Sequence, residues 1–490
     1  MDYASVVRRN QKLTALLEVA KAMTAERDLD RLLNLIMRES VRTVDAERCT
    51  LFLLDRERGE LWSKIAHGMA QEIIRLQIGV GIAGHVAETG EILNIADAYE
   101  DARFSRSTDV QTGYHTKTIL CVPMIGTKGV VGVVQALNHA GGPFGADDEE
   151  LLMALCANAA AAIENASLYE EIERLFEGFV KASVTAIEAR DPTTSGHSER
   201  VATLCVTLLD VLPRSGLKFS SCSFGKDDVR ELRYAALLHD FGKVGVREHV
   251  LVKADKLYPH ELSMLEQRFE QALYEAEVEM LRERVSLLDR GDRAGLEQLA
   301  IRYRARVSEL DEILAFIKKC NRPTVLEAGG FDRLAEISRR TFVDARGQRR
   351  ALLNEHEVKN LSIGRGSLNE AERKEIESHV THTYNFLRQI PWTRDLARVP
   401  TIAYGHHEKI DGSGYPLGAP AMELPVQTRI MTISDIYDAL TASDRPYKSA
   451  LTRERAISIL DDEAKRSKVD RELLTVFVEA DVPRLALGHR

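Results

Sequence analysis

The sequence lacks several features that would place it in a class at once. Its six cysteines include no C-x-x-C pair, which argues against a zinc ribbon or a redox-active dithiol. It has no run of about 18 apolar residues, so we expect no membrane span. The first residues lack the apolar stretch and cleavage site of a signal peptide. These absences favour a protein of the reducing cytoplasm.

An excess of positive charge is also absent. The formal net charge is −9 over 490 residues, which favours solubility and argues against the binding of a nucleic-acid polymer. At roughly 100–200 residues per domain, a chain of this length is expected to form about two to four domains. Each of these would be large enough to bury a core of its own.

Hairpin patterns mark the first part of the chain. Apolar residues at helical spacing predict a helix over 5–28, which we assign to an N-terminal segment, 1–29. Residues 49–66 and 118–138 each show two apolar strand patterns around a turn that contains glycine. A helix is expected over 146–190, with acidic side chains in its first turn, where the helix dipole favours them.

The region 30–165 resembles a GAF domain, an α+β sensor or dimerisation module with a central antiparallel sheet and flanking helices. The resemblance rests on Gly81-x-x-Gly84, on the stretch TILCVPM and on the tail NHAGGPFGADDE. The tail is similar to the signature of cyclic-nucleotide-binding GAF domains, except that His139 replaces the family lysine. Two interpretations stay open: these residues bind a ligand of unknown identity, or they stabilise the fold. The matching residues are Asn138, Phe144, Asp148 and Glu149.

The helix that leaves this region carries apolar residues at the 4-3-4 spacing of a coiled-coil seam. One interpretation is a signalling helix over 166–190 in a parallel dimer; the other is an amphipathic helix that packs on its own domain. The continuity of the helix from about 150 to 190 favours the first. We therefore expect a homodimer through the N-terminal and linker helices. The seam residues are Leu168, Ile172, Leu175 and Phe179.

The remaining region, 186–480, is predicted to be all-helical, with a long helical insertion at 262–365. The insertion is rich in charge and has helical apolar spacing. Gly291 predicts a turn between two long helices of an antiparallel hairpin, and an irregular stretch is expected after it. Ser367 or Asn369 would cap the next helix. The insertion is interpreted as a solvated arm, a dimer contact, a lid, or the binding site of a protein partner.

Histidine and aspartate residues gather near the helix ends of this region. A single histidine there is more often structural, but seven such groups favour a metal site, with iron, manganese or zinc as the ion. Neighbours on a helix cannot point the same way, so each adjacent pair is expected to serve two metals, or one metal and its second shell. The candidates are His197, His239, Asp240, His379, His406, His407 and Asp435.

Several of these residues lie in motifs of a known family. HDFGK, at 239–243, matches the HD-x-G-K core of HD phosphohydrolases, and HHEKIDGSGYP, at 406–416, matches the extended motif of the HD-GYP subfamily. GHSERV and SDIYDALTASDRPYK match as well, and the order is the same. The region therefore resembles an HD-GYP domain. Members of this subfamily hydrolyse cyclic di-GMP, and some act on cyclic GMP-AMP.

The resemblance implies a metal centre made of all seven candidates, with His197 as the additional ligand. Members with three metals have a glutamate four residues before the first histidine of the set, where this chain has Thr193. Two divalent ions, iron or manganese, are therefore predicted. Asp438 is expected either to have a structural role or to support a metal ligand from the second shell. Glu408 is expected to lie in the second shell as well.

The resemblance also assigns catalytic and substrate-binding residues. Asp240 and Lys243 are the predicted catalytic residues, and the lysine would neutralise charge on the phosphate. Substrate contacts are predicted for Lys243, Gly414, Tyr415 and Arg445. Asp411 would hold the glycine-rich loop through a local side-chain hydrogen bond.

The predicted activity is hydrolysis of a cyclic dinucleotide, cyclic di-GMP first, by a hydroxide held between two ions and under control of the GAF domain. One alternative is an adaptor that binds a cyclic dinucleotide without cleaving it. Another is an HD phosphohydrolase that acts on cyclic GMP-AMP or on another phosphorylated substrate. The chain departs from the family in one respect: 139 residues separate Asp240 from His379, where the family has a short gap.

Overall fold

The structure is a computed structural model. It divides into two compact units, Met1–Gly178 and Phe179–Arg490. Side chains are described from residue 14 onward, and the described residues are 3–63, 74–106, 109–110, 113–191, 195–216, 219, 223–323, 329–344, 346–442 and 450–488.

A six-stranded antiparallel sheet forms the centre of the first unit. Its strand order is β3-β2-β1-β6-β5-β4, so both predicted hairpins, β1–β2 and β5–β6, pair as neighbours. The long strands β1 and β6 pair with each other and form the middle of the sheet. The strands are β1 (Ala46–Asp55), β2 (Glu60–Ser63), β3 (Ile74–Gln77), β4 (Leu93–Ile95), β5 (Ile119–Gly126) and β6 (Gly129–His139).

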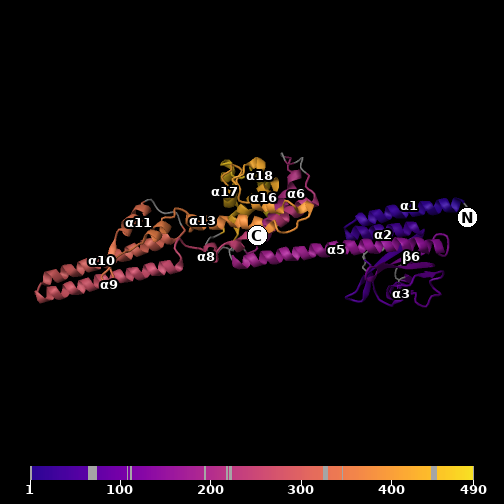
Figure 1. Cartoon of the computed structure of the whole chain (residues 1–490), viewed down its shortest axis with the longest axis horizontal. Helices are drawn as coiled ribbons and strands as arrows, with labels where there is room; N and C mark the ends of the chain where they lie inside the picture. The colour runs from indigo at the N-terminus through magenta and orange to yellow at the C-terminus, as the bar shows by residue number, and fades with distance from the viewer. Residues whose placement is uncertain are drawn as a thin grey trace. The chain divides into compact units, whose positions relative to one another are not determined.

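Helices cover both faces of this sheet, because successive strand residues point to opposite sides (Figure 1). The helices α2 (Leu29–Thr43) and α5 (Ala146–Arg190) pack on the face that includes Leu51. The short helix α3 (Gly81–Thr89) packs on the other face, which includes Phe52. The first helix, α1 (Tyr3–Ala25), contacts α2. Among the cysteines of these cores, the three predicted to be buried are buried: Cys49, Cys121 and Cys156.

The helix α5 is, among the described helices, the one long and apolar enough to cross a membrane. An 18-residue window has a mean hydropathy of 1.4, and 44% of that window is buried. Interrupting polar residues keep it from being a continuous apolar run, so our run-based prediction did not include it. Leu152, Leu155 and Ile163 of this helix pack in the core against the sheet. Packing against the sheet therefore accounts for the apolar composition, as in the core helices of soluble proteins.

Outside the insertion, the described part of the second unit is built from helices, as predicted. The helices α6, α7 and α16 pack together, and α14 and α15 pack on each other. The helices outside the insertion are α6 (His197–Val211), α7 (Lys226–Leu238), α8 (Glu248–Leu251), α13 (Glu370–Glu377), α14 (His379–Leu387), α15 (Val399–Tyr404), α16 (Val426–Thr441), α17 (Arg453–Lys465), α18 (Arg471–Glu479) and α19 (Val482–Leu487).

The insertion begins with the predicted helical hairpin. The helices α9 (Pro259–Asp289) and α10 (Arg293–Asn321) lie side by side in opposite directions (Figure 1). Gly291 takes the turn with φ +67°, a left-handed conformation that suits glycine. Asn369 caps α13, since its side chain accepts a hydrogen bond from the Glu372 amide at 3.0 Å.

The stretch after the hairpin is not irregular, which corrects our expectation. It forms α11 (Gly330–Ser338), the two-stranded hairpin β7 (Thr341–Val343) with β8 (Arg349–Ala351), and α12 (Glu355–Leu361). Phe342 is buried in one core with residues of α9 and α10. Elements this short show little periodicity, and tertiary packing stabilises them.

Candidate metal centre

Three predicted ligands share one local arrangement. His239, His379 and His406 each follow a helical turn, and Nδ1 of each lies 2.6–2.7 Å from the backbone carbonyl three residues earlier. Because a carbonyl only accepts, each Nδ1 carries the proton and each Nε2 has a free lone pair. The three Nε2 atoms are buried and make no hydrogen bond within the described part of the chain. Since buried polar atoms are rarely left unpaired, neighbouring lone pairs of this kind fit a bound cation.

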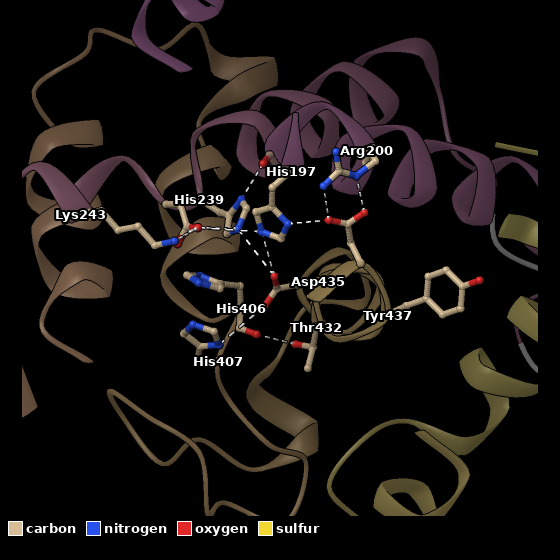
Figure 2. A network of polar contacts seen from close by, with 12 residues as sticks. His197, Arg200, His239, Lys243, His406, His407, Thr432, Asp435 and Tyr437 are labelled. Carbon is tan, nitrogen blue, oxygen red and sulfur yellow. Dashed lines mark hydrogen bonds and ion pairs between the residues drawn. The ribbon is translucent and has the colours of Figure 1, made fainter. Parts of the chain in front are cut away.

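The seven predicted ligands come together in one place. Ring centroids are 4.8 Å apart for His239 and His406, and 5.5 Å apart for His379 and His406. Figure 2 shows several of these side chains turned toward one another from different helices. Two sets of three have ligand atoms within 4.8 Å of one another: His197, His239 and Asp240 in one, and His379, His406 and His407 in the other.

Asp240 belongs to the first set and also lies close to the second. Its Oδ2 is 3.5 Å from Nε2 of His239, and its Oδ1 is 3.3 Å from Nε2 of His379. Burial disfavours the charged carboxylate, but Lys243 and the neighbouring histidines outweigh burial and hold the pKa of Asp240 well below its usual value. The carboxylate oxygen and the Nε2 lone pair of His379 are both acceptors. A cation would convert that contact from repulsive to attractive.

Asp435, on α16, connects the same two sets from the other side. Its Oδ1 is 3.2 Å from Nε2 of His197, and its Oδ2 is 3.8 Å from Nδ1 of His407. The other ring nitrogen of His197 lies 2.7 Å from Asp438, which also accepts from Arg200 Nε at 2.7 Å. Burial lowers the pKa of His197, but Asp435 and Asp438 outweigh it and raise that pKa to about 9. Asp438 therefore orients His197, the structural role expected for it.

Three other histidines of the centre have lowered pKa values. Burial lowers the pKa of His239, lowers that of His406 further, and lowers that of His407 to about 4. These rings are therefore neutral at neutral pH. A metal binds imidazole in its neutral form, so burial prepares the site for an ion.

The adjacent pairs correct our expectation that neighbours must diverge. His239 is the residue that caps the end of α7, and Asp240 leaves helical geometry with φ −96° and ψ 4°. His406 and His407 come after the end of α15. Since the chain leaves the helix at both places, the members of each pair belong to the same set of close ligand atoms. Residue spacing alone does not show where a helix ends.

Gly242, in the HD-x-G-K motif, allows two segments of the centre to approach closely. A Cβ at this position would lie 1.9 Å from the carbonyl oxygen of His379. Thr383 joins the same segments: its hydroxyl accepts from the Gly242 amide at 2.8 Å and donates to the His239 carbonyl at 2.9 Å. Sequence reasoning missed Thr383, because its role lies in contacts with residues far away in the sequence.

The glycine-rich loop forms one wall of the centre. The ring of Tyr415 lies 4.8 Å from the ring of His407. Asp411 accepts hydrogen bonds from the Ser413 amide at 2.9 Å and hydroxyl at 2.7 Å, the local bond that was predicted. Tyr415 therefore occupies a position where it can contact a molecule bound beside His407.

Two residues of this loop act on the loop itself. A Cβ on Gly414 would lie 2.3 Å from the amide nitrogen of Lys409, so the close approach at this glycine is to the chain's own backbone. Glu408 accepts from the amides of Leu417 at 2.6 Å and Ala419 at 3.0 Å. Its carboxylate therefore holds the loop, whereas we expected Glu408 to support a metal ligand from the second shell.

Lys243 is held by two carboxylates. Its Nζ lies 2.8 Å from Asp240 and 3.2 Å from Asp191, and despite burial these two raise the pKa of Lys243. Asp191 follows the end of α5 and is buried. Beside it, Arg190 donates to the carbonyl of Val244 at 2.5 Å. Asp191 is a site residue that sequence reasoning missed, because it lies outside the motifs.

The GAF-type signature residues form contacts within the first unit. Asn138 accepts from the Lys117 amide at 2.6 Å and donates to the Tyr114 hydroxyl at 2.9 Å. His139, in the place of the family lysine, has Nε2 3.7 Å from Asp148. These contacts support the interpretation that the residues stabilise the fold. Thr193 and Arg445 lie outside the described residues.

Comparisons with known families identify both units. A GAF domain model matches residues 28–163, and two HD domain models match residues 194–314 and 356–473. The first HD match ends within the insertion, and the second begins near the end of the insertion. They include all seven predicted ligands.

Relatives with curated names match about a third of the chain. The probable 3′,5′-cyclic phosphodiesterase pde-5 of Caenorhabditis elegans is 34% identical over 185 residues, 35% of this chain and 25% of that protein. The dual 3′,5′-cyclic-AMP and -GMP phosphodiesterase 11A of Takifugu rubripes is 35% identical over 183 residues, 34% of this chain and 20% of that protein. The matched part is thus a quarter or less of either relative.

Two solved structures match parts of the chain. The GAF domain of a phosphoenolpyruvate-protein phosphotransferase from Coxiella burnetii is 23% identical, with a TM-score of 0.31 over 33% of this chain and 98% of that chain. A GAF domain/HD domain protein from Geobacter sulfurreducens is 16% identical, with a TM-score of 0.26 over 30% of this chain and 98% of that chain. From the family matches, the chain consists of an α+β GAF domain followed by a helical HD domain that contains the candidate metal centre.

Proposed function

We propose that the chain is a metal-dependent phosphodiesterase that hydrolyses a cyclic dinucleotide, cyclic di-GMP first, under control of its GAF domain. The observation that supports this most is the convergence of the seven predicted ligands around the three buried Nε2 lone pairs. The names of the phosphodiesterase relatives support the reaction type. The HD-GYP motif supports the choice of a cyclic dinucleotide.

The ligand set fits a pair of divalent ions, iron or manganese. His239, His379 and His406 would bind through Nε2, and Asp240 and Asp435 face both sets of ligand atoms. Two ions bound there would lower the pKa of a water molecule and neutralise charge on a phosphodiester. Imidazole and carboxylate ligands suit either metal.

The remaining residues would bind and orient the substrate. Lys243, fixed by Asp240 and Asp191, holds a positive charge at the edge of the centre, where a non-bridging phosphate oxygen would lie. Tyr415 would stack on a base or donate its hydroxyl proton, since burial raises the pKa of Tyr415 and keeps it protonated. Arg445 is proposed to bind a second phosphate through two hydrogen bonds.

A second candidate substrate is a 3′,5′-cyclic mononucleotide, because the curated relatives are named for cyclic AMP and cyclic GMP. A third candidate function is a signalling adaptor that binds a cyclic dinucleotide without cleaving it. The insertion between Asp240 and His379 favours a further binding surface and thus supports the adaptor.

We also propose a dimer in the cytoplasm. The predicted seam on α5 is exposed by 49% to 77% at Leu168, Ile172, Leu175 and Phe179, which supports a parallel contact with a second α5. The five cysteines described are free thiols, which supports a reducing compartment.

The test is an assay of the purified chain loaded anaerobically with iron or manganese. Metal content is measured together with hydrolysis of cyclic di-GMP, cyclic GMP-AMP, cyclic AMP and cyclic GMP. We expect about two ions per chain and cleavage of cyclic di-GMP. Cleavage of a mononucleotide alone would select the second candidate. Binding of a cyclic dinucleotide without any cleavage, at full metal content, would select the adaptor.

A further inference from the structure

The outer face of α9 carries an apolar stripe that is exposed in the described part of the chain. Its five members are exposed by 43% to 67%. Their spacing is 4-3-4-3, and at 3.6 residues per turn they lie within about 40° of one line along the helix. The stripe residues are Tyr274, Val278, Leu281, Val285 and Leu288.

The stripe is on the opposite side of α9 from α10. Leu265, Phe269 and Ala272 of α9 are buried in the core shared with α10, half a turn away from the stripe. Further along, Glu283 forms an ion pair with Arg302 of α10 on that same side. The hairpin's own packing therefore does not account for the stripe.

The period of the stripe indicates that a helix packs on it. A narrow stripe that repeats every 3.5 residues is the surface that a left-handed coiled coil buries. The flanking charges reverse along the helix: Glu275 and Glu277 flank the first half, and Arg282 and Arg284 the second. A helix with this pattern is complementary in charge to a copy of itself that runs in the opposite direction.

We propose that α9 pairs with α9 of a second copy of the chain in an antiparallel coiled coil. When Val278 lies opposite Leu281 of the second copy, Glu277 lies beside Arg284 of that copy, and two-fold symmetry repeats both contacts. The dipoles of the two helices also oppose each other in this orientation.

The antiparallel register also fits the ends of the hairpin. The turn at Gly291 would reach the level of Arg268 on the second copy, short of Pro259, where α9 begins. A parallel pair would also bring Glu277 beside Arg282 of the other copy, but it would place Glu270 beside Glu275, two like charges. The antiparallel register pairs Glu275 with Arg282 and Glu277 with Arg284. The helices are already formed in the hairpin, so pairing does not require a disordered segment to fold.

Substitution within the stripe tests the contact. Leu281→Asn is compared with Ile301→Asn on α10, where the side chain is 66% exposed and outside the stripe. Sedimentation velocity over a concentration series of the full chain measures association. We expect Leu281→Asn to raise the dissociation constant of one association step at least about tenfold, since each dimer loses two buried leucines. Ile301→Asn should leave it unchanged.

The proposal is wrong if Leu281→Asn and the wild-type chain associate alike while circular dichroism shows both to be folded. It is also wrong if the two asparagine variants weaken association equally. A dimer formed through α5 would remain in both variants and would appear as a separate step.

Charge reversal tests the orientation. Glu277→Arg and Arg284→Glu should each weaken the association step, because each places like charges together. The double variant should restore it, because the antiparallel pair regains an arginine beside a glutamate. In a parallel pair the double variant would place the arginine introduced at position 277 beside Arg282 of the other copy, and association would stay weak. Failure of the double variant to restore association would overturn the antiparallel arrangement.

Discussion

At the scale of the residue, the candidate centre depends on contacts that motifs do not reveal. Most of the ligands were found because they lie in recognisable motifs: GHSERV, HDFGK, HHEKIDGSGYP and SDIYDALTASDRPYK. Thr383 and Asp191 were not found, since each acts through a tertiary contact with a motif residue far away in the sequence. The reason for Gly242 also appears only in three dimensions, as the lack of space beside His379.

The first prediction concerns Asp191, proposed to position Lys243. Asp191→Asn keeps the shape of the side chain but removes its charge, so Lys243 would be held by Asp240 alone. We expect phosphodiester hydrolysis to fall roughly tenfold with metal content unchanged, because a small displacement of a catalytic group has a large effect on rate. Asp191→Glu should recover part of the activity. An unchanged rate in Asp191→Asn would rule out the positioning role.

The second prediction concerns Gly242. Gly242→Ala places a methyl group 1.9 Å from the His379 carbonyl oxygen, so α14 must move away. The expected cost is about 3 kcal/mol in the free energy of unfolding of the HD domain, together with lost metal affinity. Denaturant unfolding and elemental analysis measure these quantities. The control is Gly178→Ala on α5, where nothing lies within 4 Å and the helix should gain up to about 1 kcal/mol.

At the scale of the element, helices were predictable where apolar periodicity was long. The hairpin of α9 and α10 follows from spacing and from one glycine. The small elements after it do not, because β7, β8 and α12 are three to seven residues long and gain their stability from a shared core. The ends of α7 and α15 were also not predictable. At both places the helix ends, and the change in backbone geometry lets adjacent ligands point toward one site.

The third prediction concerns the contact between the start of the insertion and α13. Lys253 Nζ lies 2.8 Å from both carboxylate oxygens of Glu372, and the Tyr258 hydroxyl donates to Glu372 at 2.8 Å. Burial raises the pKa of Glu372, but Lys253 and the Asn369 amide outweigh it and leave that pKa below its usual value.

A lowered pKa of the folded carboxyl means that its stabilisation is complete above the unfolded pKa and is lost as the pH falls through the folded pKa. The wild-type chain should therefore lose more unfolding free energy than Glu372→Gln between pH 7 and pH 3. Denaturant titrations at several pH values measure the difference. Glu370→Gln, exposed on the same helix, should behave as the wild type does. Equal pH dependence for Glu372→Gln and the wild type would contradict the prediction.

At the scale of the whole molecule, the two domains should respond differently to metal. A ligand that binds only the folded state stabilises it by about 3–4 kcal/mol at 100 to 1,000 times its dissociation constant. The candidate ligands all belong to the HD domain. Without an ion, Asp240 and Asp435 remain as buried charges among histidine rings.

The fourth prediction is therefore that chelation lowers the temperature of one of the two unfolding transitions. Scanning calorimetry of the metal-loaded chain, before and after chelation and dialysis, should show the HD transition move to lower temperature. The GAF transition should stay in place, because its core contains none of the ligands. If both transitions move equally, or neither moves, the metal is not bound where we propose.

The insertion also affects how the centre forms during synthesis. Asp240 is synthesised 139 residues before His379, so three of the candidate ligands are made well before the other four. The insertion has a core of its own, and the Lys256 amide near its start donates to the Asn321 carbonyl at 2.9 Å. By folding first, it would shorten the effective loop that separates these two groups of ligands, which reduces the entropic cost of closing it. Metal uptake would then follow the synthesis of Asp435. A nascent chain stopped at residue 365 should bind no metal ion at this centre, and the full chain should bind two.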